Sequence, residues 1–168
     1  LFLFYLTGTM QAQQTPLRVL NKIQADSLAQ QQVIYHDRVV PFNTLARDFV
    51  KKLTGKIYYK GLTPEQVISG WILYPDSWKN EPMIYIKSPE LHHLLGLESS
   101  YARLTDLFDG PVYRLQKTWQ QEQGKSSKLA KAIQETDEKV GLILMVEKEH
   151  SSSHYPLMVA CNLSPNWK

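Results

Sequence analysis

The sequence is poor in cysteine, and this scarcity limits the chemistry that the chain can perform. Cys161 is the single cysteine among 168 residues, so the chain contains no internal disulfide, no CxxC redox pair and no cysteine-rich metal site. Because Cys161 ends the apolar run 157–161, we expect a small buried residue and not a nucleophile. The absence of disulfides does not argue against an extracytoplasmic location.

The sequence also lacks an apolar run long enough to cross a bilayer. Such a run needs about 20 residues, whereas the apolar stretch 1–6 is followed at once by Thr7 and Gly8. We interpret residues 1–12 as the remnant of a signal or transmembrane segment. Residues 13–32 then form a linker and a candidate helix.

The excess of basic over acidic residues is too small to indicate a polyanionic partner. The chain has 19 basic and 16 acidic residues, and the resulting net charge of +3 is too weak to predict nucleic-acid binding. The lysines are scattered, and we interpret them as solvated helix faces. An apolar content of 43% with 21% charged residues is typical of a globular domain with a core.

Enzyme signatures are missing as well. The sequence contains no G-x-S-x-G, no H-E-x-x-H and no phosphate-binding glycine loop. His92 and His93 are adjacent on a predicted helix, so they point about 100° apart and do not suit one metal ion. His150 and His154 lie beside a serine-rich loop. We therefore predict neither catalytic residues nor a metal site.

What the sequence does contain is a set of clear helix signals. Residues 43–55 are predicted to form a helix, with Asn43 as its N-cap and Gly55 at its left-handed end. A second helix is predicted to begin at Thr63, where Gln66 completes a capping box. The longest helix is predicted over residues 127–149, with its apolar face on Leu129, Ile133, Val140, Leu144 and Ile143.

The remaining segments predict short strands and further short helices. Residues 33–40 favour a β-hairpin, and residues 82–87 favour a strand. Residues 101–108 and 112–119 are each predicted as a short helix. The expected fold class is α+β and mainly α, a single compact helical domain with a few short strands. We expect this unit to extend over residues 17–146 and to be looser after about residue 149.

Six motifs occur in an order that resembles a known family. They are Arg38-x-x-Pro41-x-x-Thr44-x-Ala46, Leu62-Thr63-Pro64-Glu65-Gln66-Val67, Pro82-Met83-Ile84-Tyr85-Ile86, Leu94-Leu95-Gly96-Leu97, Tyr101-Ala102 with Asp106-Leu107-Phe108-Asp109, and Glu135-Thr136-Asp137-Glu138-Lys139-Val140. The series resembles the extracytoplasmic domain of system II cytochrome c biogenesis proteins of the fused Ccs/Res type, in the form typical of Bacteroidetes-like bacteria. It departs from that family at His36 and Asp37, where a glycine usually precedes the arginine.

The resemblance implies a function for a longer, membrane-bound protein. That protein would deliver haem and attach it to apocytochrome c, while residues 33–168 would form its domain at the periplasmic face of the inner membrane. This domain is expected to have an accessory or apocytochrome-positioning role and not to catalyse attachment. Its partners would be apocytochrome c and the membrane-embedded remainder of the same protein. Haem is the implied cofactor of the full-length family, but no haem-ligating histidine of the family can be placed here.

Two other functions remain open from the residues alone. The chain could be a general periplasmic or membrane-tethered protein-interaction module without a haem role. An enzyme of unknown type has the least support. A continuation of the gene into apolar helices with a tryptophan-rich loop would favour haem delivery over both.

Four residues stand out as a structural signature: Arg38, Pro41, Thr44 and Asp137. Asp137 interrupts the apolar stripe of the longest predicted helix, and a buried carboxylate needs a partner. We hypothesise an internal charge-assisted bond of Asp137, either with Arg38 or with capping backbone amides. The alternative is that the helix is rotated or bent so that Asp137 reaches water.

Two further residues are candidate partner contacts. His36 sits in a predicted turn, and Trp78 sits in a loop-like stretch near prolines. Trp71 and Trp119 lie on apolar helix faces and are expected in the core.

Overall fold

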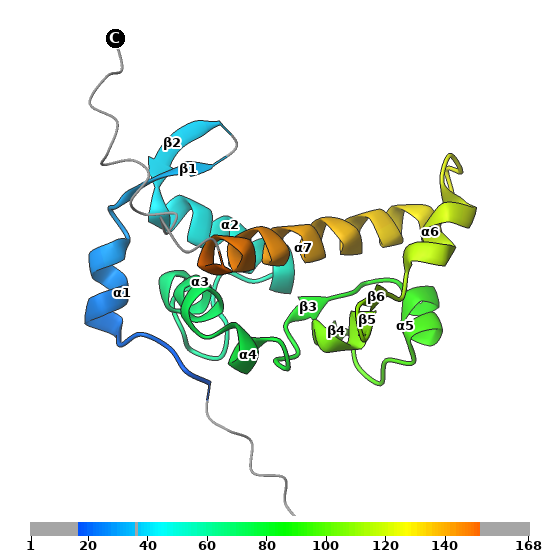
Figure 1. Cartoon of the computed structure of the whole chain (residues 1–168), viewed down its shortest axis with the longest axis horizontal. Coiled ribbons are helices and arrows are strands. Elements are labelled where there is room, and N and C mark those ends of the chain that lie inside the picture. The colour runs from blue at the N-terminus through cyan, green and yellow to red at the C-terminus, as the bar shows by residue number, and fades with distance from the viewer. Residues whose placement is uncertain (1–16, 36, 152–168) are drawn as a thin grey trace, which may run out of the picture.

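The computed structural model describes residues 17–35 and 37–151 of the chain. These residues form seven α-helices, one short 3-10 helix and three two-stranded antiparallel ribbons. The helices are α1 (Lys22–Leu28), α2 (Phe42–Thr54), α3 (Pro64–Leu73), α4 (Pro75–Trp78), α5 (Pro89–Leu95), η1 (Thr105–Leu107), α6 (Gln116–Glu122) and α7 (Lys128–Ser151). The strands are β1 (Gln32–Tyr35), β2 (Arg38–Pro41), β3 (Ile84–Tyr85), β4 (Tyr101–Ala102), β5 (Phe108–Asp109) and β6 (Val112–Tyr113). The fold is α+β and mainly α, as predicted (Figure 1).

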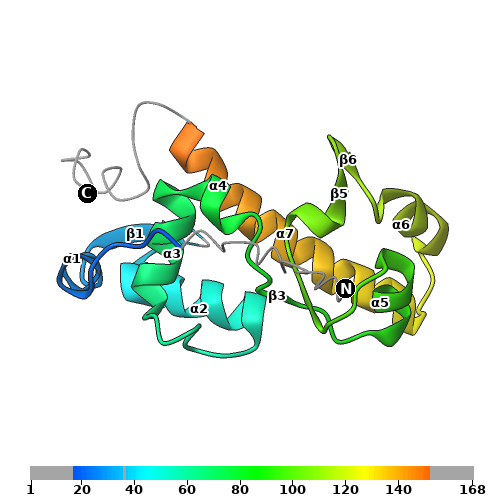
Figure 2. The ribbon, with the colours of Figure 1, turned by 90° about the horizontal axis from the view of Figure 1, so that it is seen from below.

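Helix α7 extends across the molecule and contacts both halves of it. One half contains α2 and α3, and the other contains α5 and α6 (Figures 1 and 2). The side chains of Ile133, Val140, Ile143 and Val146 are buried along this helix. The predicted long helix is confirmed, but Leu144, expected on its apolar face, is 44% exposed. The buried face is therefore rotated relative to the predicted one.

The N-cap of helix α2 lies two residues before the one that the sequence suggests. Its N-cap is Pro41, which offers no side-chain cap, and Gly55 ends it in the left-handed conformation with φ 74°. Asn43, predicted as the cap, lies inside the helix and donates its side-chain amide to Glu65 of α3. The prediction of Asn43 as a cap is wrong because this contact between helices engages the side chain instead.

The start of α3 agrees with the predicted capping box. The Thr63 hydroxyl accepts from the Gln66 backbone N–H at 3.4 Å, and the Gln66 side chain accepts from the Thr63 N–H at 3.1 Å. The Gln66 amide also donates to the carbonyl of Leu20 at 2.9 Å. The capping box thus also attaches the segment that precedes α1.

The predicted hairpin forms from β1 and β2, with Val33 opposite Val40. The segment 101–119 does not form the two short helices that were predicted for it. It contains the strands β4, β5 and β6 as well as η1 and α6. Strand β4 forms because Ala102 pairs with Ile84 of β3, a contact distant in sequence.

One hydrophobic cluster extends from Val33 to Val146 and unites these elements. Trp71 and Trp78 are both fully buried in it, with ring centroids 6.1 Å apart. Gly70 on α3 makes room for the Trp78 indole, because a Cβ there would lie 2.5 Å from Cε2 of that ring. Within residues 17–35 and 37–151, no helix is both long and apolar enough to span a membrane.

Candidate functional site

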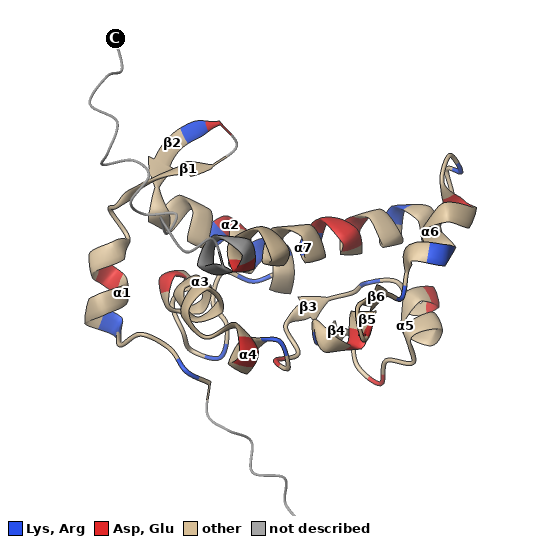
Figure 3. Cartoon of the chain, viewed as in Figure 1, with Lys and Arg blue, Asp and Glu red and all other residues tan. Residues whose placement is uncertain are grey.

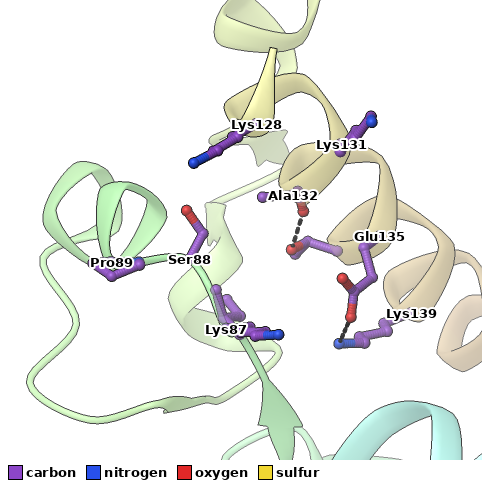
Figure 4. Close-up of a pocket in the computed structure, with 10 residues that line it drawn as sticks. Lys87, Ser88, Pro89, Lys128, Lys131, Ala132, Glu135 and Lys139 are labelled. Atoms are coloured by element: carbon purple, nitrogen blue, oxygen red, sulfur yellow. Dashed lines mark hydrogen bonds and ion pairs between the residues drawn. The ribbon is translucent and has the colours of Figure 1, made fainter. Parts of the chain in front are cut away.

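Two hollows lie along α7 and share the side chains of Glu135 and Lys139 in their walls. The first, of about 310 Å³, lies between α7 and the segment that joins β3 to α5 (Figure 4). The second, of about 530 Å³, lies between α7, α2 and β1. We call the two together the α7 groove.

The wall contributed by α7 follows from the periodicity of the helix. Lys128, Lys131, Glu135 and Lys139 all line the groove and are spaced three or four residues apart. Residues at this spacing share one helix face. At a rise of 1.5 Å per residue, this wall is about 16 Å long from Lys128 to Lys139.

Other elements supply the opposite walls. Lys87 and Ser88 follow β3, whereas Lys51 and Lys52 come from the last turn of α2. Figure 4 shows Lys87 reaching toward α7 and Lys128 reaching from α7 toward Ser88. Ser88 also caps α5 by accepting from the N–H of Leu91 at 3.4 Å, which fixes the segment beside the groove.

Lys139 occupies the junction of the two hollows. Its side chain is only 5% exposed, and its ammonium donates to the Tyr85 carbonyl at 2.6 Å and to Glu135 at 2.8 Å. A buried ammonium needs such partners because desolvation is costly. Lys139 therefore joins α7 to β3, and two of its three donors have acceptors among the described residues.

Positive charge is concentrated in the groove. Its lining contains six lysines and two carboxylates, a net charge of +4. The whole chain carries +3, so the rest of the sequence is almost neutral. Figure 3 colours the basic residues of α2 and α7 blue. Lys52 forms an ion pair with Glu138 at 2.7 Å, whereas no ion pair with a described residue is formed by Lys51, Lys87, Lys128 or Lys131. Such an arrangement can bind an anionic group.

The predicted bond between Arg38 and Asp137 is not formed. Both residues are exposed, and neither has an ion pair within the described part of the chain. The Asp137 carboxylate instead lies near the hydroxyl of Tyr113, which is buried and makes no hydrogen bond of normal geometry with a described residue. Burial, and then the charge of Asp137, raise the pKa of Tyr113. The alternative, in which Asp137 reaches water, agrees with the structure.

The two other signature residues lie at the start of α2. Pro41 ends β2 and precedes the helix, and Thr44 is exposed in its first turn. Neither reaches the α7 groove. Arg38, Pro41 and Thr44 therefore lie at the strand-to-helix junction, whereas Asp137 lies on α7, and none of the four lines the groove.

Of the two candidate partner contacts, Trp78 and His36, the structure describes only Trp78. Trp78 is 0% exposed, and its indole N–H donates to the Arg18 carbonyl at 3.0 Å. The expectation that Trp78 meets a partner is wrong, because Pro75 starts the short helix α4 and turns the ring into the core. His36 lies outside the described residues, as do residues 1–12 and Cys161.

His92 and His93 of α5 are not arranged as a pair of axial haem ligands. Haem iron takes an axial side chain such as His, Met, Cys or Tyr. Nε2 of His92 lies 2.6 Å from the Ile86 carbonyl oxygen and is engaged there, while His93 is exposed on α5. Within residues 17–35 and 37–151, no cluster of His, Cys, Asp or Glu is placed to hold a metal ion.

Sequence reasoning missed Lys139, which is central to the groove. The predicted apolar stripe contained Asp137, whereas the buried stripe passes through Thr136 and Lys139. A usable signal was present, since Lys139 lies four residues after Glu135 and four before the apolar Ile143.

Comparison with known proteins finds sequence similarity to a curated relative. No protein-family model matches it. It is similar to Protein NrfI of Wolinella succinogenes, with 28% identity over 159 residues. This similarity supports a cytochrome c biogenesis family. The alignment covers 91% of this chain but only 17% of NrfI, so the shared region is a small part of that relative.

Proposed function

We propose that this chain is the extracytoplasmic domain of a membrane-bound cytochrome c biogenesis protein of the fused Ccs/Res type. In this proposal the domain lies at the periplasmic face of the inner membrane and positions apocytochrome c. Haem delivery and attachment take place in the membrane-embedded remainder of the same protein. Haem is thus a cofactor of the whole protein, and no step of its chemistry is assigned to the described residues.

The observation that carries the proposal is the extent of the similarity to NrfI. It covers 91% of this chain, so it includes nearly the whole motif series and not one isolated segment. The same alignment spans 17% of NrfI, as expected if a small domain is part of a much longer protein. The α7 groove adds a lysine-lined surface suited to binding.

The test uses the gene product that contains this chain, expressed with a c-type apocytochrome in a strain without its own attachment machinery. Replacing residues 17–151 by a flexible linker should lower holocytochrome, measured by haem staining, by about tenfold or more. The level of the protein in the membrane and its haem absorbance should stay unchanged. Unaltered holocytochrome with the linker would favour a general interaction module without a haem role.

A further inference from the structure

We propose that the α7 groove binds an extended, acidic segment of a partner polypeptide. The inference concerns a surface and the chemistry of its ligand, so it goes beyond the proposed role in cytochrome c biogenesis. It would hold equally for a general interaction module. The argument depends on the shape of the groove, its charges and the group at its centre.

The shape favours an extended ligand. The α7 wall is about 16 Å long, which matches about five residues of extended chain at 3.3 Å each. The hollows of about 310 and 530 Å³ meet along this wall at Lys139. The amines of Lys51, Lys87 and Lys128 come from three different segments and are spread along the groove. A small anion would contact only some of them.

The charges favour an acidic ligand. Four lysines of the groove, Lys51, Lys87, Lys128 and Lys131, have no ion pair with a described residue, so their charges are available to a ligand. The carboxylates in the lining are Glu135, which is bound to Lys139, and Asp48. Lysine is a point charge on a flexible stem, without the fixed fork of arginine. It therefore suits carboxylates at varied positions along a peptide.

The centre of the groove offers a preorganised donor. Lys139 is held by the Tyr85 carbonyl and by Glu135, which leaves one ammonium N–H without an acceptor among the described residues. Both hollows reach this side chain. Packing already fixes the Lys139 side chain. Binding of a carboxylate to it therefore requires little further ordering of the protein.

The first experiment measures binding by fluorescence anisotropy. The probe is a labelled octapeptide of alternating Glu and Ser, compared with the corresponding Gln and Ser peptide, and the protein is the 168-residue chain. We expect the Glu peptide to bind and the Gln peptide not to bind. Raising the ionic strength from about 20 mM to about 150 mM should weaken binding, because exposed charges are screened within about 8 Å at the higher value.

Matched variants locate the site. The combined change Lys51→Gln, Lys87→Gln and Lys128→Gln should weaken binding of the Glu peptide by about tenfold or more, since each exposed pair contributes modestly. The control combines Lys56→Gln, Arg103→Gln and Lys117→Gln, which remove the same charge from exposed positions outside the groove lining. It should change the affinity less than twofold. Circular dichroism checks that both variants keep the fold.

Three results would overturn the proposal. The first is no binding of the Glu peptide at low salt. The second is equal weakening by both triple variants, which would indicate attraction to net charge alone. The third is binding of anionic lipid vesicles with the same lysine dependence when the peptide does not bind. Peptide affinity and holocytochrome yield are separate readouts, so failure of this inference and failure of the proposed function are distinguishable.

Discussion

At the scale of the residue, Gly70 and Trp78 show how one absent methyl group shapes the core. Gly70→Ala would place a Cβ 2.5 Å from Cε2 of the Trp78 ring, which is fully buried and cannot move aside. We expect a loss of about 1–3 kcal/mol in the free energy of unfolding, typical of overpacking. Urea denaturation followed by tryptophan fluorescence measures it.

Gly141→Ala is the matched control on α7. A Cβ at this exposed position has nothing within 4 Å. Alanine is the better helix former by about 1 kcal/mol, so this variant should be as stable as the parent or more so. Equal destabilisation by both alanines would show that Trp78 does not limit the space at Gly70.

Tyr59 makes the stability depend on alkaline pH. Burial, followed by its hydrogen bond to Glu81, raises the pKa of its hydroxyl above the ordinary value of about 10. The folded state therefore keeps this proton when the unfolded state has lost it. The stabilisation is complete below about pH 10 and falls as the pH rises above that value. Tyr59→Phe should make this decline shallower.

The same substitution has a cost at neutral pH. Glu81 is 9% exposed and would lose the donor Tyr59, although its ion pair with Lys60 would remain. We expect a loss of about 1–2 kcal/mol in urea denaturation at pH 7. Tyr113→Phe is the control, because the buried Tyr113 hydroxyl makes no hydrogen bond of normal geometry within the described part of the chain. Its stability at pH 7 should change by less than about 0.5 kcal/mol, and a larger loss would reveal a bond to Asp137.

At the scale of the element, the start of α3 depends on Thr63. Thr63→Ala removes the acceptor for the Gln66 N–H and should cost about 1 kcal/mol. Thr44→Ala in the first turn of α2 serves as the control, because Thr44 is exposed and makes no side-chain hydrogen bond with a described residue. Thermal unfolding should separate the two variants. If both melt alike, the capping box does not stabilise α3.

Elements with local signals were the ones that the sequence predicted well. The α3 box, the Gly55 terminus and the length of α7 all depend on neighbours within one or two helical turns. The rotation of α7 was missed because Leu144 is as apolar as Ile143, and only packing against other helices decides which is buried. Likewise, β4 depends on β3, about 17 residues earlier in the chain.

At the scale of the whole molecule, the candidate site could not be predicted from the sequence. The α7 groove combines lysines from α2, from the segment after β3 and from α7. Their scattered positions were read as solvated faces, because nothing local tells which faces meet. The resemblance to cytochrome c biogenesis proteins is supported at that coarse level, since the similarity to NrfI extends over most of the chain, whereas the fused Ccs/Res type stays a prediction.

The continuity of the core predicts how the molecule unfolds. One cluster of buried residues reaches from the hairpin to the end of α7, and α7 contacts both halves. We expect a single cooperative transition, with the same midpoint by circular dichroism at 222 nm and by tryptophan fluorescence. Two separate midpoints would show that the half with α2 and α3 unfolds independently of the half with α5 and α6.

The segment before α1 is fastened to the side of α3 and α4 by three side chains. Trp78 and Gln66 donate to the carbonyls of Arg18 and Leu20, and the Arg18 guanidinium lies 4.5 Å from the centre of the Tyr74 ring. A force applied to the chain at Leu17 would act first on these two hydrogen bonds and on the contact between Arg18 and Tyr74. The α7 groove would keep its shape under such a load, because none of its lining residues comes from the segment before α1.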